Sequence, residues 1–374
     1  MIIYLLVAIL MITIGYNVYT SRFSTKISFP LVFGILSIFW GVAYIYAPDI
    51  PEYILYFKKQ TYNWFDTGFK LPSSSFELGF NILSCMVKSL TEHYYIYQFF
   101  LFSSELLLVM IGLKKILKDK IALIMICAMF FVLPSNLLSA LRQGIAISLF
   151  IFAVPYIYEH KFFKYCILII FASFFHTSAI FLLLLYWLPL VKYIVSAPKI
   201  LLLYFLILNV CYFFNITISN ALDSILLTLF DLYEKSAMYV RYTNVDLEET
   251  ISNFGILKIL EMDFIYVVFI LINKDNSKTM LLLKSMFLIY CTLNMLLGGI
   301  LAHRISYYFV ILYHICLIYS LCIIGRYLLR DERNGYLLSC FYLIGLNLFY
   351  FQNPFSDAME YKNMFLEHIL YGIY

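Results

Sequence analysis

Two arginines and one histidine interrupt stretches of this sequence that are otherwise apolar. Arg142 lies near the start of the run 139–150, His176 lies between two apolar stretches, and Arg304 begins another apolar run. A charged side chain in such a setting costs roughly 2.5–3.5 kcal/mol unless an anionic partner or water stabilises it. A guanidinium offers paired donors that fit a pyrophosphate, and an imidazole can accept a hydroxyl proton near neutral pH. The three residues therefore predict a site for an anionic substrate.

Each of these residues also has a purely structural interpretation. Arg142 could extend its side chain to the outer membrane interface as a helix anchor, and His176 could hydrogen-bond a backbone carbonyl. Ala140, Gly144 and Ser148 recur at every fourth position around Arg142. Small residues with this spacing predict that another helix approaches closely at this point.

The composition indicates a membrane protein with many helices. Of its 374 residues, 63% are hydrophobic and only 13% are charged, whereas soluble chains are about 25% charged. We predict an all-α, polytopic transmembrane helix bundle of about twelve helices, within a range of about 10–14, that forms a single domain over residues 1–374. The first apolar segment lacks a basic region and a cleavage site, so we interpret it as a retained helix. The predicted spans are residues 2–19, 28–47, 95–113, 121–135, 140–158, 163–175, 177–192, 199–216, 255–273, 279–299, 304–325 and 335–352.

The stretch 163–192 decides the predicted topology, because it is too long for one straight span and short for two. A hairpin at His176 places most of the 26 Lys and Arg residues on the inner side, as the positive-inside rule requires. A single span would instead export the basic cluster between Arg326 and Arg333. The hairpin is therefore the preferred interpretation. It puts on the outside both termini, two longer loops near residues 48–94 and 217–254, and the residues Arg142, His176 and Arg304.

Two carboxylates of the first outside loop, Asp49 and Glu77, are candidate bases or acceptors for sugar hydroxyls. No set of His, Cys, Asp or Glu residues has the sequence spacing of a metal site, and no nucleotide-binding motif is present. We therefore expect neither a cofactor nor a catalytic metal. The formal net charge of +4 reflects mostly lysines that flank helices, so we expect the lipid bilayer, and no nucleic acid, as a partner.

The central block of the sequence resembles one protein family. Its segments Leu141-Arg142-Gln143-Gly144-Ile145-Ala146 and Phe175-His176-Thr177-Ser178-Ala179 are similar in order and spacing to the signature of the EpsG-like, Wzy-type polysaccharide polymerases. Sparser landmarks of that family match Asp49…Tyr53, Glu77-Leu78-Gly79-Phe80 and Arg304-Ile305-Ser306-Tyr307-Tyr308-Phe309. The resemblance implies a GT-C-like membrane glycosyltransferase of the bacterial inner membrane. It would join undecaprenyl-pyrophosphate-linked oligosaccharide repeat units into O-antigen, capsule or exopolysaccharide at the periplasmic face.

The resemblance also implies roles for individual residues and partners. His176 would either activate the acceptor hydroxyl or help to bind the pyrophosphate, and Asp49 or Glu77 would be the rival base. The lipid pyrophosphate and its sugars would be bound by Arg142, Gln143, Ser178, Arg304 and Tyr308. The expected partners are the lipid-linked donor and acceptor, a Wzz-type chain-length regulator and the flippase of the same pathway. Three other functions stay open at this point: an O-antigen ligase that uses the same donor, a non-enzymatic flippase for lipid-linked oligosaccharides, and an acyltransferase.

Overall fold

Apolar helices dominate the chain, as the composition predicts. The computed structural model describes residues 2–44, 49–74, 76–191, 197–214, 256–297 and 299–351, and this part of the chain contains no β-strand. The predicted all-α, polytopic fold class is confirmed. Two compact units are distinguished, one formed by residues 1–186 with 329–374 and the other by residues 187–328. A single domain over residues 1–374 stays a prediction.

Within the described residues, every predicted span overlaps one helix or consecutive helices. The first unit contains α1 (Ile2–Tyr19), α2 (Thr25–Gly41), α6 (Tyr94–Leu117), α7 (Asp119–Ala128), α8 (Val132–Leu138), α9 (Leu141–Ala153), α10 (Pro155–Tyr158), α11 (Phe162–Ser173) and α21 (Glu332–Phe351). The 3₁₀ segment Thr177–Val191 begins in this unit and continues into the second. The second unit contains α13 (Pro198–Phe213), α17 (Ile256–Ile265), Tyr266–Ile272, α18 (Lys278–Cys291), Thr292–Leu297, α19 (Gly299–Ser306), Tyr307–Phe309 and α20 (Val310–Leu328).

Five of the described helices are long and apolar enough to cross a membrane. They are Ile2–Tyr19, Tyr94–Leu117, Leu141–Tyr158, Lys278–Leu297 and Ala302–Leu328, and α7 with α8 adds a sixth if a bent pair counts as one span. Shorter apolar helices accompany them, among them α2, α11 and α13. The chain is thus a multi-pass membrane protein, whereas the count of about twelve spans stays a prediction.

The predicted span 121–135 is not a straight helix. α7 and α8 are bent by 80° relative to each other. Pro134 lies inside α8, and the ring of a proline clashes with the carbonyl of the residue four positions earlier, here Phe130. The break between the two helices falls at this residue, so the proline accounts for its position.

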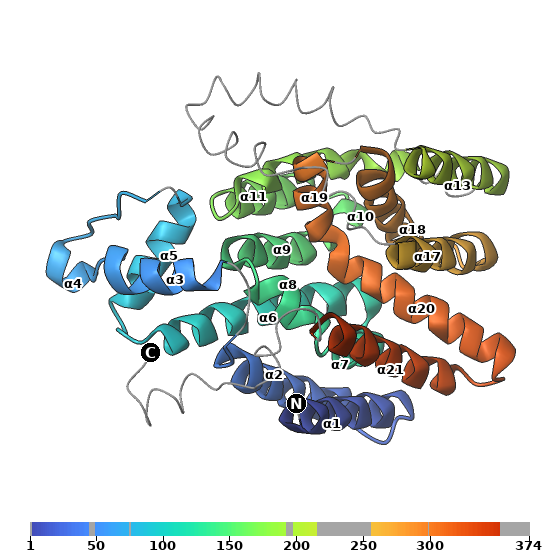
Figure 1. Ribbon diagram of the computed structural model, residues 1–374, viewed down its shortest axis with the longest axis horizontal. Helices are drawn as coiled ribbons and strands as arrows, with labels where there is room; N and C mark the ends of the chain where they lie inside the picture. The colour runs from blue at the N-terminus through green and yellow to red at the C-terminus, as the bar shows by residue number, and fades with distance from the viewer. Residues whose placement is uncertain are drawn as a thin grey trace. The chain divides into compact units, whose positions relative to one another are not determined.

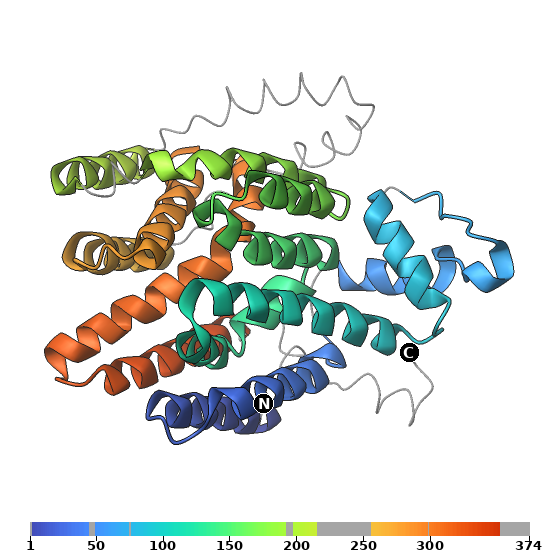
Figure 2. The ribbon, with the colours of Figure 1, turned by 180° about the vertical axis from the view of Figure 1, so that it is seen from behind.

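Within the first unit, α6 packs against α2 and α9 (Figures 1 and 2). Near the C-terminal end of α6, Lys115 Nζ lies 4.7 Å from the ring centre of Phe152 and 5.2 Å from that of Tyr156, which follow late in α9 and in α10. α6 and α9 therefore run in the same direction, and their N-terminal ends lie at the same end of the unit.

The chain reverses direction around residues 174–176, as the hairpin prediction requires. The Tyr165 hydroxyl donates to the Leu182 carbonyl oxygen (2.5 Å), although 17 positions separate the two residues. In one continuous helix these residues would lie about 25 Å apart. The Phe162 and Tyr186 rings, 4.9 Å apart, confirm that the 3₁₀ segment folds back along α11, so His176 lies at the turn.

The first predicted outside loop is largely helical. It contains α3 (Ile50–Leu55), the π-helical turn Tyr56–Gln60, α4 (Trp64–Thr67) and α5 (Leu78–Lys88). We call residues 50–74 with 76–88 the α3–α5 cap. This cap protrudes beyond the N-terminal ends of α6 and α9, and α4 is its most distant element (Figures 1 and 2). Its centre is an aromatic core of Tyr53, Tyr56, Phe76 and Phe80, whose contacting ring centres lie 4.7–5.8 Å apart.

In the second unit, α20 packs against α18 and α17. Lys258 Nζ donates to Glu261 Oε1 (2.6 Å) and lies 4.0 Å from the ring centre of Tyr313, which joins α17 to α20. The predicted outside loop 217–254 and the predicted outside tail from residue 353 lie outside the described residues.

Candidate active site

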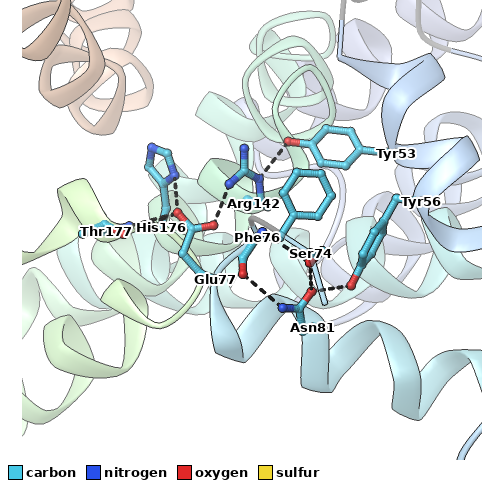
Figure 3. A network of polar contacts seen from close by, with 9 residues as sticks. All are labelled: Tyr53, Tyr56, Ser74, Phe76, Glu77, Asn81, Arg142, His176 and Thr177. Carbon is cyan, nitrogen blue, oxygen red and sulfur yellow. Dashed lines mark hydrogen bonds and ion pairs between the residues drawn. The ribbon is translucent and has the colours of Figure 1, made fainter. Parts of the chain in front are cut away.

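The candidate site begins at Arg142, in the first turn of α9. This turn packs tightly against α8, because a methyl group at Gly144 would come within 2.1 Å of the Leu137 carbonyl oxygen. The close helix approach predicted from the small residues is therefore confirmed at Gly144. The Arg142 side chain is only 17% exposed and points toward the α3–α5 cap (Figure 3).

Three cap residues surround the Arg142 guanidinium (Figure 3). Its Nη1 donates to Glu77 Oε2 (2.6 Å), and its Nε donates to the Tyr53 hydroxyl (3.4 Å). The guanidinium carbon lies 4.4 Å from the ring centre of Phe76, a distance typical of a cation–π contact. Within the described part of the chain, Nη2 has no hydrogen-bond partner, so the outer edge of the guanidinium keeps donors for a ligand.

Glu77 lies directly before α5 and joins Arg142 to the hairpin turn. Its side chain does not cap α5. Instead, its Oε1 lies 3.5 Å from His176 Nδ1 and accepts from the Thr177 backbone N–H (3.4 Å) and hydroxyl (3.5 Å). Burial alone would raise the pKa of Glu77, but the hydrogen bond with His176 and the charge of Arg142 outweigh it and lower the pKa to about 2. Glu77 is therefore an ionised carboxylate at neutral pH.

A second layer of polar contacts holds the segment before Glu77 in place. Asn81 Nδ2 donates to the Phe76 carbonyl oxygen (3.0 Å), and Asn81 Oδ1 accepts from the Tyr56 hydroxyl (2.6 Å) and the Ser74 hydroxyl (2.8 Å) (Figure 3). Asn81 is buried, so these bonds satisfy a polar group that would otherwise be costly. They fix the backbone that carries Phe76 and Glu77.

A backbone contact fixes α5 against the turn that carries His176. The Gly79 N–H donates to the Phe174 carbonyl oxygen (2.9 Å). A methyl group at Gly79 would lie 2.8 Å from that oxygen, which is closer than real side chains approach. Glycine at this position therefore allows α5 to touch the turn, and Glu77 is brought to His176 and Thr177 as a result.

The structure brings together three of the predicted site residues: Arg142, His176 and Glu77. All three are mostly covered, with 17%, 13% and 11% of their side chains exposed. Asp49 is exposed and lies one turn before Tyr53, whose N–H donates to the Asp49 carbonyl oxygen (3.1 Å). Its carboxylate is not part of the network around Glu77 described above.

The remaining predicted residues divide between the two units. Gln143 directly follows Arg142, Ser178 lies two positions after His176, and each is buried with 9% exposure. Arg304 lies in α19, where it is partly exposed, and Tyr308 is buried in the following 3₁₀ turn. Both belong to the second unit. A common cavity that contains Arg142, His176 and Arg304 stays a prediction.

Sequence reasoning gave no role to three residues that contact the charged groups. Tyr53 and Phe76 enclose the Arg142 guanidinium, and Thr177 contacts Glu77. Phe76 and Thr177 could have been found because they are the sequence neighbours of Glu77 and His176, and Tyr53 because it ends the family landmark Asp49…Tyr53. Burial of Tyr53 raises its pKa, although the nearby charge of Arg142 opposes this. Tyr53 therefore serves as a neutral hydrogen-bonding group.

The arrangement couples one ionised carboxylate to a cation and to an imidazole. Such a set can bind an oxyanion through the guanidinium and can move a proton through the imidazole. In the described part of the chain, no group of three or more His, Cys, Asp or Glu side chains could hold a metal ion. Independence from metals stays a prediction.

Comparisons with known proteins give one family. No curated protein and no solved structure matches the chain. The profile of the EpsG family matches residues 26–367, which are nearly the whole chain and include the Arg142–Glu77–His176 cluster. The chain therefore belongs to the EpsG family, whose members are in general membrane polysaccharide polymerases of the glycosyltransferase kind.

Proposed function

We propose that this protein polymerises undecaprenyl-pyrophosphate-linked oligosaccharide repeat units at the periplasmic face of the bacterial inner membrane. The observation that carries the proposal is the convergence of Arg142, Glu77 and His176, which come from three separate segments of the first unit. A lipid pyrophosphate is the leaving group of this reaction, and the bond between it and the sugar is already activated. No nucleotide is therefore needed, in agreement with the absence of a nucleotide-binding motif from the sequence.

Arg142 is the proposed pyrophosphate ligand. Its guanidinium stacks on Phe76 and is fixed through Nη1 and Nε, so it is held in one orientation before substrate binds. A preorganised cation stabilises charge that develops on a leaving group without the cost of reorientation. Arg304 is the proposed second cation for the two phosphates.

His176 is the proposed general base. A carboxylate with a pKa near 2 is too weak a base to take a hydroxyl proton, which argues against Glu77 in that role. Glu77 faces Nδ1 of His176, which favours a proton on Nδ1 and leaves Nε2 as the acceptor. We assign Glu77 the role of a positioning residue, as carboxylates have in other acid–base sites built on histidine.

The proposed reaction balances without a redox partner. The acceptor hydroxyl oxygen forms a bond to the anomeric carbon of the donor, and its proton passes to His176 Nε2. The bond between the anomeric carbon and the pyrophosphate oxygen breaks, and that oxygen keeps the electron pair as the lipid pyrophosphate leaves. The departing anion is stabilised by Arg142.

The Arg142–Glu77 ion pair can stay closed during this chemistry. Glu77 occupies the guanidinium donor Nη1, whereas a phosphate oxygen, which accepts the same donors as a carboxylate, can bind at Nη2. We infer that the incoming pyrophosphate binds at Nη2 while Glu77 keeps Arg142, His176 and Thr177 in place.

Purified protein incubated with a lipid-linked repeat unit tests the proposal. A ladder of products that differ by one repeat unit is expected. Transfer of glycan only to lipid A core would select an O-antigen ligase, and translocation across vesicles without new glycosidic bonds would select a flippase. Either result would overturn the polymerase assignment.

A further inference from the structure

The far end of the α3–α5 cap displays aromatic rings to solvent. The side chains of Phe65 and Phe69 are 81% and 77% exposed. The Phe69 ring centre lies 5.2 Å from that of Trp64, and the two rings belong to one cluster around the short helix α4. Exposed apolar groups that gather in one place usually mark a binding surface. We call Trp64, Phe65 and Phe69 the aromatic tip.

The backbone holds the aromatic tip in a defined conformation. Gly68 and Phe69 both have left-handed backbone angles, with φ of 65° and 63°. This conformation is unfavourable for a bulky residue such as phenylalanine. It turns the chain back, so that the Trp64 indole N–H donates to the Lys70 carbonyl oxygen (3.0 Å). The backbone at Phe69 is therefore strained, and this conformation holds the Phe69 ring in solvent beside Trp64.

Two further contacts make the tip rigid. Asn63 Oδ1 accepts from the Phe65 backbone N–H (2.9 Å), which caps α4. The Trp64 N–H donates to the Ser89 hydroxyl (2.8 Å), which ties α4 to the end of α5. A rigid aromatic surface loses little conformational freedom when a ligand binds.

The position of the tip narrows the choice of ligand. α4 lies beyond the N-terminal ends of α6 and α9, on the side of Arg142 (Figures 1 and 2). Both helices belong to candidate membrane spans. We expect a surface beyond the ends of two candidate spans to lie outside the bilayer core, where a ligand reaches it from the aqueous side.

A glycan fits this position and this chemistry. Sugar rings have apolar faces that stack on aromatic side chains and hydroxyl edges that hydrogen-bond to polar neighbours. Asp66 and Lys70 are exposed next to the rings and can serve those hydroxyls. A polysaccharide polymerase must also guide a glycan that extends into water from the lipid at its site. We propose that the aromatic tip binds the oligosaccharide part of the substrate, an assignment that rests on the proposed function.

A titration with free glycan tests this assignment apart from catalysis. The probe is the oligosaccharide released by mild acid from the lipid-linked repeat unit, which carries neither lipid nor pyrophosphate. Trp64 is one of three tryptophans in the chain, so its emission is obtained as the difference between wild-type protein and Trp64→Phe. A saturable change in that difference is expected. Phe65→Ala and Phe69→Asn should each raise the Kd about tenfold through loss of a ring contact.

The variants separate ring loss from other effects. Asparagine tolerates left-handed angles, so Phe69→Asn removes the ring and keeps the turn. Leu90→Ala is the matched control, because Leu90 is 79% exposed and lies outside the aromatic tip; its Kd should match wild type. A Kd unchanged in both phenylalanine variants would overturn the proposal. The proposal would also be overturned if free glycan caused no change in emission in protein that still polymerises lipid-linked units. A protein partner would then be the ligand to test at the aromatic tip. Glycan binding without polymer formation would instead overturn only the polymerase assignment.

Discussion

Glu77 Oε2 lies 2.6 Å from Arg142 Nη1, although 65 positions separate the two residues. The contact joins the α3–α5 cap to the first turn of α9, and through the other oxygen of Glu77 it extends to the hairpin turn at His176. One carboxylate thus sets the spacing between a cation and an imidazole.

Arg142→Lys should reduce polymer formation at least about tenfold. Lysine keeps the charge, but a compact ammonium cannot reproduce the planar paired donors or the stacking on Phe76. The initial rate of ladder formation is the measurement. Arg22→Lys is the control, because Arg22 is exposed in a turn of the same unit and should behave as wild type. Equal rates for all three proteins would remove Arg142 from the site.

His176→Asn should lower turnover by about 10²–10⁴-fold, the usual contribution of a general base, while the protein still folds. The control is His160→Asn, since His160 is exposed and has a left-handed φ of 54° that asparagine tolerates. Turnover measured at saturating lipid-linked substrate separates loss of catalysis from loss of binding. Near-normal turnover in His176→Asn would show that another group takes the proton.

The stability difference between wild type and Glu77→Gln should depend on pH. The pKa of Glu77 falls from 4.5 to about 2 in the folded protein, so its stabilising effect is present above about pH 4.5 and is lost as the pH falls toward 2. The shift corresponds to at most about 3 kcal/mol. Melting temperatures in nanodiscs should therefore converge as the pH falls below about 4.5. A difference that grows as the pH falls from 4.5 toward 2 would contradict the ion pair.

Gly144→Ala should destabilise the first unit by about 1–3 kcal/mol, as expected for overpacking, because the added methyl would meet the Leu137 carbonyl at 2.1 Å. Gly34→Ala in α2 is the matched control. A methyl at Gly34 meets nothing within 4 Å, and alanine favours helix by up to about 1 kcal/mol. Thermal unfolding of both variants is the measurement, and equal melting temperatures would contradict the packing described for α8 and α9.

Polymer formation should persist in EDTA, because arginine can supply the charge stabilisation that a metal gives in other transferases. The assay is the product ladder with and without chelator. Loss of the ladder in EDTA and its recovery with a divalent cation would show that metal independence is wrong.

Much of the fold could be predicted from the sequence, because apolar length and charge placement are local properties. The hairpin at His176 followed from the distribution of lysines and arginines, and the Tyr165–Leu182 bond confirms it. The bend between α7 and α8 was not predicted, since the pattern of apolar residues continues through it and only Pro134 marks it.

The site was predicted in part. Arg142 and His176 were found because each breaks an apolar run, and Glu77 was named as a rival base. Its role as the link between Arg142 and His176 depends on contacts between three segments that lie far apart in the sequence. A local sequence pattern does not show such contacts. The stacking of Phe76 on Arg142 was not predicted for the same reason. Aromatic residues are common in this chain, and the sequence around Phe76 does not show which residue its ring contacts.

The bond between the Gly79 N–H and the Phe174 carbonyl has a consequence for engineering. It uses main-chain atoms only, so the distance between the Glu77 carboxylate and the His176 imidazole does not depend on the exposed side chains of α5. Residues such as Leu78 and Met86, both about half exposed, can be exchanged without displacing the reactive groups. New substrate preferences can therefore be sought on this helix by mutation while its chemistry is kept constant.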